Sequence, residues 1–218
     1  MTTDPRDMQA PSGFHADRKL EPEDLGPDPI GAFAAWLAEA EATGVPLPNA
    51  MALATADADG RPSVRHVLLR GIDEHGFVFF TNQESRKGRQ LAENAHVALV
   101  FLWKELDRQV SVTGRAEPID DGASDAYFAT RPRDAQIGAW ASPQSATIHG
   151  RDDLVRRVAD AEARFTDVVP RPPFWGGYVV MPDTIEFWQG RRHRLHDRIR
   201  FTRDSAGARG WRVERLAP

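Results

Sequence analysis

The chain has 218 residues, of which 41% are hydrophobic and 28% are charged, and its net charge is −4. This is the composition of an ordinary globular protein, and no apolar run approaches the roughly 20 residues that span a bilayer, so we expect a soluble protein. The absence of cysteine excludes disulfides, a cysteine nucleophile, cysteine-ligated zinc and iron–sulfur clusters, and the acidic balance argues against a nucleic-acid partner. The first residues lack the pattern of a secretory signal, so we expect a cytoplasmic location.

The first segment, residues 1–29, is rich in prolines and acids and poor in apolar residues. Such a composition does not recover the entropy lost on ordering, and we expect a flexible N-terminal arm. Residues 30–218 form the predicted single domain. It begins with a helix, because Asp28 and Pro29 suit an N-cap and a first helical position, and apolar residues then recur at helical spacing up to Gly44.

From Met51 the pattern changes to short apolar runs separated by tight turns. Three of these runs, residues 51–56, 63–71 and 77–81, predict an antiparallel meander. Ser85 suits the N-cap of a helix that continues to about Asn94. Strands are predicted again at 95–103 and 108–119, and five strands so close together suggest a barrel.

The remaining chain is predicted to be helical and then again to form strands. Residues 121–166 indicate helices, the last with an apolar stripe from Leu154 to Phe165. The later strands are expected at 177–182, 184–190, 197–203 and 210–216. Because strands and helices do not alternate, we predict a mainly β protein with appended helices (α+β) built on an antiparallel barrel, not a βαβ sheet.

Cations cluster at the start of the helix predicted from Ser85. Arg86 and Lys87 occupy its first turn, where the helix dipole already places partial positive charge, so the arrangement costs stability unless an anion docks there. A solvated basic helix end would explain these two residues equally well. Arg65 and Arg70 lie in the preceding predicted strand among apolar residues, where a cation needs a partner. Together the four cations favour an anion site, with phosphate as the natural ligand.

A second cluster of cations follows Trp188. In an extended segment, Arg194, His196 and Arg198 would share one face, which suits a planar anionic ligand. Trp188 could wall an aromatic ring, Arg194 and His196 could bind or polarise a substrate, and Arg198 could reach a polar ring edge. The alternative is a surface charge cluster. A metal site on His193 and His196 lacks a supporting carboxylate pattern, and we expect no metal.

Two strings carry a family resemblance. Arg131-Pro-Arg-Asp-Ala-Gln-Ile-Gly-Ala-Trp140 and Phe187-Trp-Gln-Gly…Arg194-Leu-His-Asp-Arg198, with a terminal Arg-Leu-Ala-Pro, resemble pyridoxamine/pyridoxine 5'-phosphate oxidases, and the resemblance covers residues 48–218. It implies an antiparallel FMN-binding split β-barrel of Greek-key type and a homodimer with FMN at the subunit interface. It also implies oxidation of a phosphorylated pyridine, pyridoxamine or pyridoxine 5'-phosphate, by O2 to pyridoxal 5'-phosphate with release of H2O2, the hydride passing from substrate C4' to flavin N5.

The resemblance also assigns roles to individual residues. Arg194 and His196 would be catalytic. The family's flavin contacts fall on Arg65, His66, Val67, Leu68, Leu69, Arg70, Phe80, Thr81, Arg86, Lys87, Gln109, Gln144, Ser145, Trp188 and Arg198. Its substrate contacts fall on Arg70, Tyr127, Arg131 and Ala135 at the phosphate end of the pyridine, and on Arg194 and His196 at its ring.

Several positions depart from the family pattern. Arg70 stands where lysine is usual, Ala135 where serine is frequent, and Leu47 where an acid commonly precedes the Pro-Asn-Ala-Met run. An arginine in place of lysine keeps the charge but changes its geometry. The N-terminal Arg-x-x-Tyr of some relatives is not evident, since the comparable stretch, 12–15, reads Ser-Gly-Phe-His. These departures bear on the substrate more than on the cofactor.

Three other functions remain open. A phenazine-biosynthesis flavin oxidase shares the barrel and the ending Glu-Phe-Trp…Arg-Leu-His, and residues 50–56 and 60–63 resemble that group too, but the string 131–140 favours the vitamin B6 enzyme. A deazaflavin-dependent reductase fits the nearly complete FMN contact set less well. A non-catalytic flavin- or haem-binding split barrel would have no need of the cationic face beside Trp188.

Overall fold

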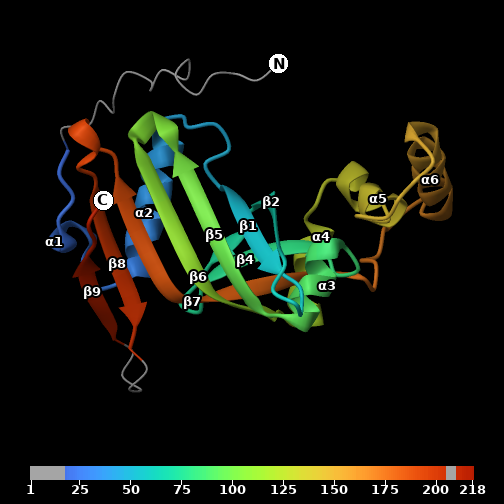
Figure 1. Cartoon of the computed structure of the whole chain (residues 1–218). Helices are drawn as coiled ribbons and strands as arrows, with labels where there is room; N and C mark the ends of the chain where they lie inside the picture. Colours follow the sequence, from blue (N-terminus) through green and yellow to red (C-terminus); the bar gives the residue numbers. More distant parts are fainter. Residues whose placement is uncertain (1–17, 205–209) are drawn as a thin grey trace, which may run out of the picture. The chain divides into compact units, whose positions relative to one another are not determined.

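The structure is a computed structural model that describes residues 18–204 and 210–218. No helix in these two ranges is both long and apolar enough to cross a membrane. The helices, shown in Figure 1, are α1 (Pro22–Leu25), α2 (Pro29–Ala42), α3 (Arg86–Glu93), α4 (Asp121–Ala129), α5 (Arg133–Ala141) and α6 (Arg151–Arg164), with short 3-10 helices η2 (Lys104–Leu106) and η3 (Arg192–Arg194). The strands are β1 (Ala50–Ala56), β2 (Pro62–Leu68), β3 (Gly71–Ile72), β4 (Phe77–Asn82), β5 (His96–Trp103), β6 (Arg108–Pro118), β7 (Trp175–Gln189), β8 (Asp197–Arg203) and β9 (Trp211–Arg215).

The strands of the described chain belong to one hydrogen-bonded sheet. Its order is β2-β1-β5-β6-β7-β4-β3, with β8 paired to β7 and β9 paired to β8. The pairs β1–β2, β3–β4, β4–β7, β7–β8 and β8–β9 are all antiparallel. The prediction of a mainly β protein with appended helices is therefore confirmed.

Residue contacts group the chain into two compact units. Within the described residues, unit 1 holds 18–48, 100–112, 183–204 and 210–218, and unit 2 holds 49–99 and 113–182. Three strands, β5, β6 and β7, contribute residues to both units. The prediction of a single domain over residues 30–218 stays a prediction.

Unit 1 has an aromatic core built on α2. Asp28 caps this helix by accepting a hydrogen bond from the Ile30 N–H at 3.0 Å, as the sequence predicted. Phe33 and Trp36, one turn apart on the buried face, contact Phe101 and Phe187, with ring centroids 4.6 and 5.0 Å apart. Edge-to-face rings of this kind stabilise a core beyond the area they bury.

The start of the described chain is packed, which corrects part of the predicted flexible arm. Leu20 and Leu25 are buried, and residues 22–25 form α1. The Leu20 N–H donates to Asp197 at 3.1 Å, and Arg215 donates to the Leu20 carbonyl at 2.9 Å. The low apolar content of residues 1–29 concealed these two leucines. Residues 1–17, the rest of the predicted arm, lie outside the described residues.

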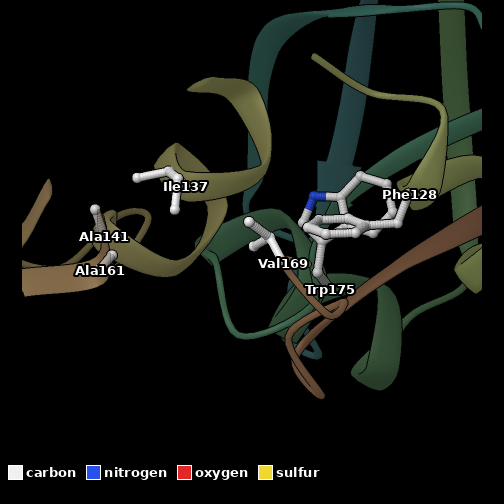
Figure 2. Packing of buried hydrophobic residues seen from close by; sticks show 6 residues of the cluster. All are labelled: Phe128, Ile137, Ala141, Ala161, Val169 and Trp175. Carbon is white, nitrogen blue, oxygen red and sulfur yellow. The ribbon is translucent and has the colours of Figure 1, made fainter. Parts of the chain in front are cut away.

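Unit 2 has two layers of core. Met51, Leu53, Phe77 and Phe79, from β1 and β4, are fully buried. Beyond the strands, α4, α5 and α6 bury a second cluster, in which α5 and α6 lie against each other (Figure 1). Figure 2 shows this cluster, which consists of Phe128, Ile137, Ala141, Ala161, Val169 and Trp175. Of the apolar stripe predicted on α6, only Ala161 is buried, and Val155 is 60% exposed.

Two strand predictions were wrong. The expected meander of three strands is interrupted. The Leu69 N–H still donates to the Asn49 carbonyl, but the Arg70 N–H donates to the Val78 carbonyl in β4, which pairs with β3 and β7. The runs 177–182 and 184–190 form one strand, β7, and not two. Proline usually interrupts a sheet. In β7, however, the residues paired with β4 end at Val180 and those paired with β8 begin at Thr184, so Pro182 lies between the two pairings.

Candidate functional site

Unit 2 contains a cavity of about 640 Å³ whose walls come from β2, β4, α3, α4, α5 and the start of β7. Its lining contains four cationic side chains and no aspartate or glutamate, so its charge is positive. The lining residues are Arg65, His66, Val67, Leu68, Arg70, Phe80, Thr81, Asn82, Lys87, Tyr127, Arg131, Ala135, Gly138, Ala139, Ser142, Gln144 and Trp175.

The first cationic group consists of Arg65 and Lys87, which line the cavity, and of Arg86, an exposed residue at the start of α3 whose charge acts on Arg65. Arg65 extends from β2, and its guanidinium donates to the Leu53 carbonyl at 2.9 Å and to the Thr55 hydroxyl at 2.8 Å. Burial lowers the pKa of Arg65, and the nearby charge of Arg86 lowers it further. No ion pair joins these three cations to a carboxylate among the described residues.

Lys87 is the most perturbed member of this group. Its ammonium is buried, and it donates to Gln144 Oε1 at 2.6 Å, Thr81 Oγ1 at 2.9 Å and Ser85 Oγ at 3.2 Å, all neutral acceptors. Burial, and after it the charge of Arg65, lowers the pKa of Lys87 from 10.5 to about 8. A buried ammonium without a counter-charge is costly, and a bound anion would relieve that cost.

Helix α3 aims Lys87 inward. Its N-cap is Ser85, as predicted, and Ser85 Oγ accepts from the Gly88 N–H at 3.3 Å and donates to the Asn82 carbonyl at 2.7 Å. Because this hydroxyl is fully buried and engaged in these hydrogen bonds, it is not available to an anion. A Cβ on Gly88 would lie 2.0 Å from the Gln83 carbonyl oxygen, so only glycine lets the first turn approach β4 so closely.

The second cationic group consists of Arg70 and Arg131. Arg131 follows α4, and burial is the main cause that lowers its pKa, with a smaller contribution from the charge of Arg70. Its Nη1 is buried and has no hydrogen-bond partner. A buried, unsatisfied guanidinium nitrogen that lines a cavity is a donor prepared for an anionic ligand.

Three aromatic rings, Phe80, Tyr127 and Trp175, also line the cavity. Phe80 stacks on Tyr127, with centroids 4.0 Å apart and planes 14° apart, and it is nearly parallel to Trp175, at 5.3 Å and 9°. Gly177 makes room for Phe80, since a Cβ there would lie 2.7 Å from the Phe80 ring and 2.3 Å from Ile119. The glycines after Trp175 therefore serve close packing.

Several residues assigned by resemblance lie outside the cavity lining. Leu69 is buried in the core, and Arg86 is exposed at the start of α3. Ser145, with a positive φ of 73°, lines a second hollow of about 500 Å³ in unit 2, which shares Asn82 and Gln144 with the cavity. Gln109 belongs to unit 1, where its amide donates to the Ser111 hydroxyl at 3.2 Å.

The second predicted cluster lies in unit 1. Trp188 and His196 are in contact, with ring centroids 4.6 Å apart, and Arg198 lies opposite Trp188 in the register of β7 and β8. The prediction of an extended face through Arg194 was wrong, because Arg194 ends η3 in a left-handed conformation with φ of 61°. Arg198 is paired with Glu186 through two hydrogen bonds of 2.8 and 3.1 Å, which raise its pKa.

His196 is held in one tautomer. The Arg191 N–H donates to its Nδ1 at 3.0 Å, so the neutral ring carries its proton on Nε2. Burial lowers the pKa of His196, and the charge of Arg194 lowers it further. The ring is therefore a neutral hydrogen-bond donor near pH 7. The described residues contain no group of three His, Asp or Glu side chains that could hold a metal ion.

Sequence reasoning missed Trp175 and the small residues of the cavity wall. Trp175, Asn82 and Ser142 line the cavity beside the assigned residues, as do Gly138 and Ala139 on α5. Trp175 precedes a predicted strand and belongs to no charge pattern. The adjacent Gly176 and Gly177 were the available signal, since paired glycines at a strand start indicate a close approach of the backbone.

Family models and curated relatives of this chain agree in their descriptions. A family model described as pyridoxamine 5'-phosphate oxidase matches residues 37–165, and one described as pyridoxine 5'-phosphate oxidase C-terminal dimerisation region matches residues 175–218. A pyridoxine/pyridoxamine 5'-phosphate oxidase of Burkholderia thailandensis is 56% identical over 199 residues, which cover 91% of this chain and 93% of that protein. Its counterpart in Burkholderia pseudomallei is 55% identical with the same coverage.

Two solved structures are similar in fold. PhzG from Burkholderia lata, in complex with tetrahydrophenazine-1-carboxylic acid, superposes with a TM-score of 0.85 at 35% identity, covering 92% of this chain and 98% of that one. An FMN-binding protein of Nostoc punctiforme related to pyridoxamine 5'-phosphate oxidase gives a TM-score of 0.68 at 19% identity, with 92% and 100% covered. The predicted FMN-binding split-barrel fold is thereby confirmed.

Proposed function

We propose, given that the chain belongs to the pyridoxamine 5'-phosphate oxidase family, that this oxidoreductase uses FMN to oxidise pyridoxamine 5'-phosphate, pyridoxine 5'-phosphate or both. The observation that carries the proposal is the cavity of unit 2, whose lining combines cations and aromatic rings and contains no carboxylate. Both the proposed cofactor and the proposed substrate carry a phosphate and a flat ring.

The residues present fit FMN. Lys87 is a buried cation and Arg65 a half-buried one, neither has a carboxylate partner among the described residues, and burial lowers the pKa of both. A phosphate monoester would supply that compensation through charge-assisted hydrogen bonds. We therefore assign the flavin's phosphate to the first cationic group, with Thr81 and Gln144 as neutral neighbours of Lys87.

The substrate's phosphate is assigned to the second cationic group. Arg131 offers a buried Nη1 without a partner, and Arg70 adds charge from the adjacent wall. Ala135, where relatives often carry a serine, contributes no hydrogen bond, so the two arginines would bear this role alone. The expected result is binding driven by charge and sensitive to salt.

The protein's own contribution to the chemistry is to bind, orient and exclude water. When bound, FMN would accept the hydride lost by the substrate's C4' carbon and pass the electrons to O2, which leaves as H2O2. His196, through its Nε2–H, and Arg194 are proposed to hold the pyridine ring, and the Trp188 ring to wall it. Holding the reacting atoms in place is the main effect that such residues supply.

The proposed assembly is a homodimer with FMN at the subunit interface. It is supported by the match of residues 175–218 to a model described as a dimerisation region. Size measurement by light scattering tests it, and a monomer that still binds FMN would contradict it.

The test of the function is direct. Purified protein should be yellow, its extracted cofactor should be FMN, and pyridoxamine 5'-phosphate with O2 and water should yield pyridoxal 5'-phosphate, ammonia and one equivalent of H2O2. Colourless protein that takes up no FMN would refute the cofactor assignment. Yellow protein that produces neither aldehyde nor peroxide would refute the substrate assignment alone.

A phenazine oxidase is the second candidate, because the PhzG structure superposes with a TM-score of 0.85 at 35% identity. The ligand named with that protein is a carboxylic acid without a phosphate. Two separate cationic groups in one cavity favour two phosphates, and hence the vitamin B6 substrate. Turnover of a dihydro- or tetrahydrophenazine carboxylate in preference to pyridoxamine 5'-phosphate would reverse this ranking.

A further inference from the structure

Arg131 is oriented by aromatic rings and not by acids. Its guanidinium carbon lies 4.9 Å from the centroid of the Trp175 ring and 5.5 Å from that of Phe128. No ion pair to Arg131 occurs in residues 18–204 and 210–218, and its buried Nη1 has no hydrogen-bond partner. A cation over a ring face gains electrostatic attraction without giving up its hydrogen-bond donors. The stacked guanidinium therefore keeps Nη1 available to a ligand.

Trp175 is itself fixed. It is only 6% exposed, and Figure 2 shows its indole beside Phe128, with which it makes an edge-to-face contact at 5.1 Å. On another side it is nearly parallel to Phe80 at 5.3 Å. Its backbone carbonyl accepts from Arg171 at 2.6 Å, and its residue pairs with Asn82 in the register of β4 and β7. A ring held from several sides can orient the side chain that stacks on it.

We propose that Trp175 is a positioning residue that orients Arg131 toward the phosphate of the substrate and so makes the enzyme select phosphorylated over unphosphorylated substrates. The inference rests on the proposed function. A planar guanidinium stacks on an indole, whereas a lysine ammonium at the same place would not present a fixed donor geometry. The stacking also offsets part of the cost of burying a charge while no anion is bound.

The test compares two substrates that differ only in the phosphate, pyridoxamine 5'-phosphate and pyridoxamine. In Trp175→Leu, we expect KM for the phosphorylated substrate to rise about 10-fold, with kcat and FMN content unchanged, because the stacking is worth about that factor in binding. The kcat/KM for pyridoxamine should stay within about 2-fold of wild type. Trp175→Phe keeps a ring face, so its KM for the phosphorylated substrate should rise less than about 3-fold.

Trp140 provides the matched control. It also carries a stacked arginine, Arg164, at 4.8 Å, but it lines no part of the cavity. Trp140→Leu should leave the ratio of the two kcat/KM values unchanged. If Trp175→Leu lowers kcat/KM equally for both substrates, or for neither, Trp175 has only a packing role and the inference is overturned.

Two further measurements keep the inference testable. If Trp175→Leu does not fold, Arg131→Lys, which keeps the charge and loses the planar stacking, should give the same selective loss for the phosphorylated substrate. If the wild-type protein oxidises neither substrate, the proposed function fails, and inorganic phosphate is then titrated calorimetrically into wild type and Trp175→Leu as purified. Binding about 10-fold weaker in the variant would still support the positioning role, and equal or absent binding would overturn it.

Discussion

Replacing Lys87 by methionine separates cofactor binding from folding, because the ammonium is proposed to bind the phosphate of FMN but should make almost no net contribution to folding. The fall of its pKa from 10.5 to about 8 corresponds to a cost of about 3 kcal/mol for the charge in the ligand-free protein. Its hydrogen bonds to Gln144, Thr81 and Ser85 contribute roughly 1 kcal/mol each. The two contributions nearly cancel, so Lys87→Met should change the free energy of unfolding of the ligand-free protein by less than about 1 kcal/mol at pH 7.

Cofactor binding should respond differently. Loss of one charge-assisted hydrogen bond to a phosphate costs about 1.5–3 kcal/mol, so Kd for FMN should rise roughly 10- to 100-fold. Urea unfolding measures the stability, and fluorescence titration of free FMN measures Kd. Lys104→Met, at an exposed lysine on η2, should change neither quantity. A variant at Lys87 that binds FMN within about 3-fold of wild type would refute the assignment of the phosphate to this group.

The pH dependence gives an independent check on Lys87. Folding lowers the pKa of Lys87, so between about pH 8 and 10.5 the unfolded chain binds more protons than the folded protein. The free energy of unfolding of the ligand-free wild type should therefore increase across that range, relative to that of Lys87→Met. FMN binding favours the protonated ammonium, so the wild-type Kd should rise above pH 8, and the variant's should not. Parallel pH profiles for the two proteins would contradict the proposed contact.

Three further predictions concern unit 1 and the packing behind the cavity. Arg194→Ala should retain FMN, measured by absorbance, and lose most turnover; unchanged turnover would contradict its role. His196→Gln, which can donate a hydrogen bond but cannot act as a base, should keep more than about a tenth of kcat/KM, whereas His196→Leu should lose about 100-fold, and equal losses would indicate a base. In wild type, the hydrogen bond from the Arg191 N–H to His196 Nδ1 should be lost only as pH falls below 6.5, since the pKa of His196 is lowered and protonation places a proton on Nδ1. Gly177→Ala should destabilise by about 1–3 kcal/mol in urea, because its Cβ would overlap Phe80, while Gly138→Ala, with open space, should not.

The sequence was informative where a local pattern has a local physical cause. The N-caps at Asp28 and Ser85 were predicted correctly, because each side-chain oxygen accepts a hydrogen bond from a backbone N–H in the first turn of its helix. Arg65 and Lys87 were expected to share an anion site, since cations beside a core strand and in a first helical turn are each unfavourable without a ligand, and anion binding stays a prediction. Both line the same cavity.

What the sequence could not give depends on contacts between distant segments. Arg70 and Arg131 approach each other only because β2 and the end of α4 line one cavity, and no periodicity predicts that. Arg194 lies at the end of a short 3-10 helix and has a left-handed conformation, whereas the alternation of charges in the sequence had indicated an extended segment. Pro182 was predicted to separate two strands, because proline has no N–H to donate. In the structure it lies between the residues of β7 that pair with β4 and those that pair with β8, so neither pairing needs that donor.

The division of the chain into two units has a consequence for its synthesis. Every residue of unit 2 lies between positions 49 and 182, so that unit is fully available before the last strands leave the ribosome. Unit 1 draws on the beginning, the middle and the end of the chain, and Arg215 contacts Leu20 and Glu21. Its folding must therefore wait for translation to finish, and we expect a released chain that ends near residue 190 to protect unit 2 from protease while unit 1 remains cleavable.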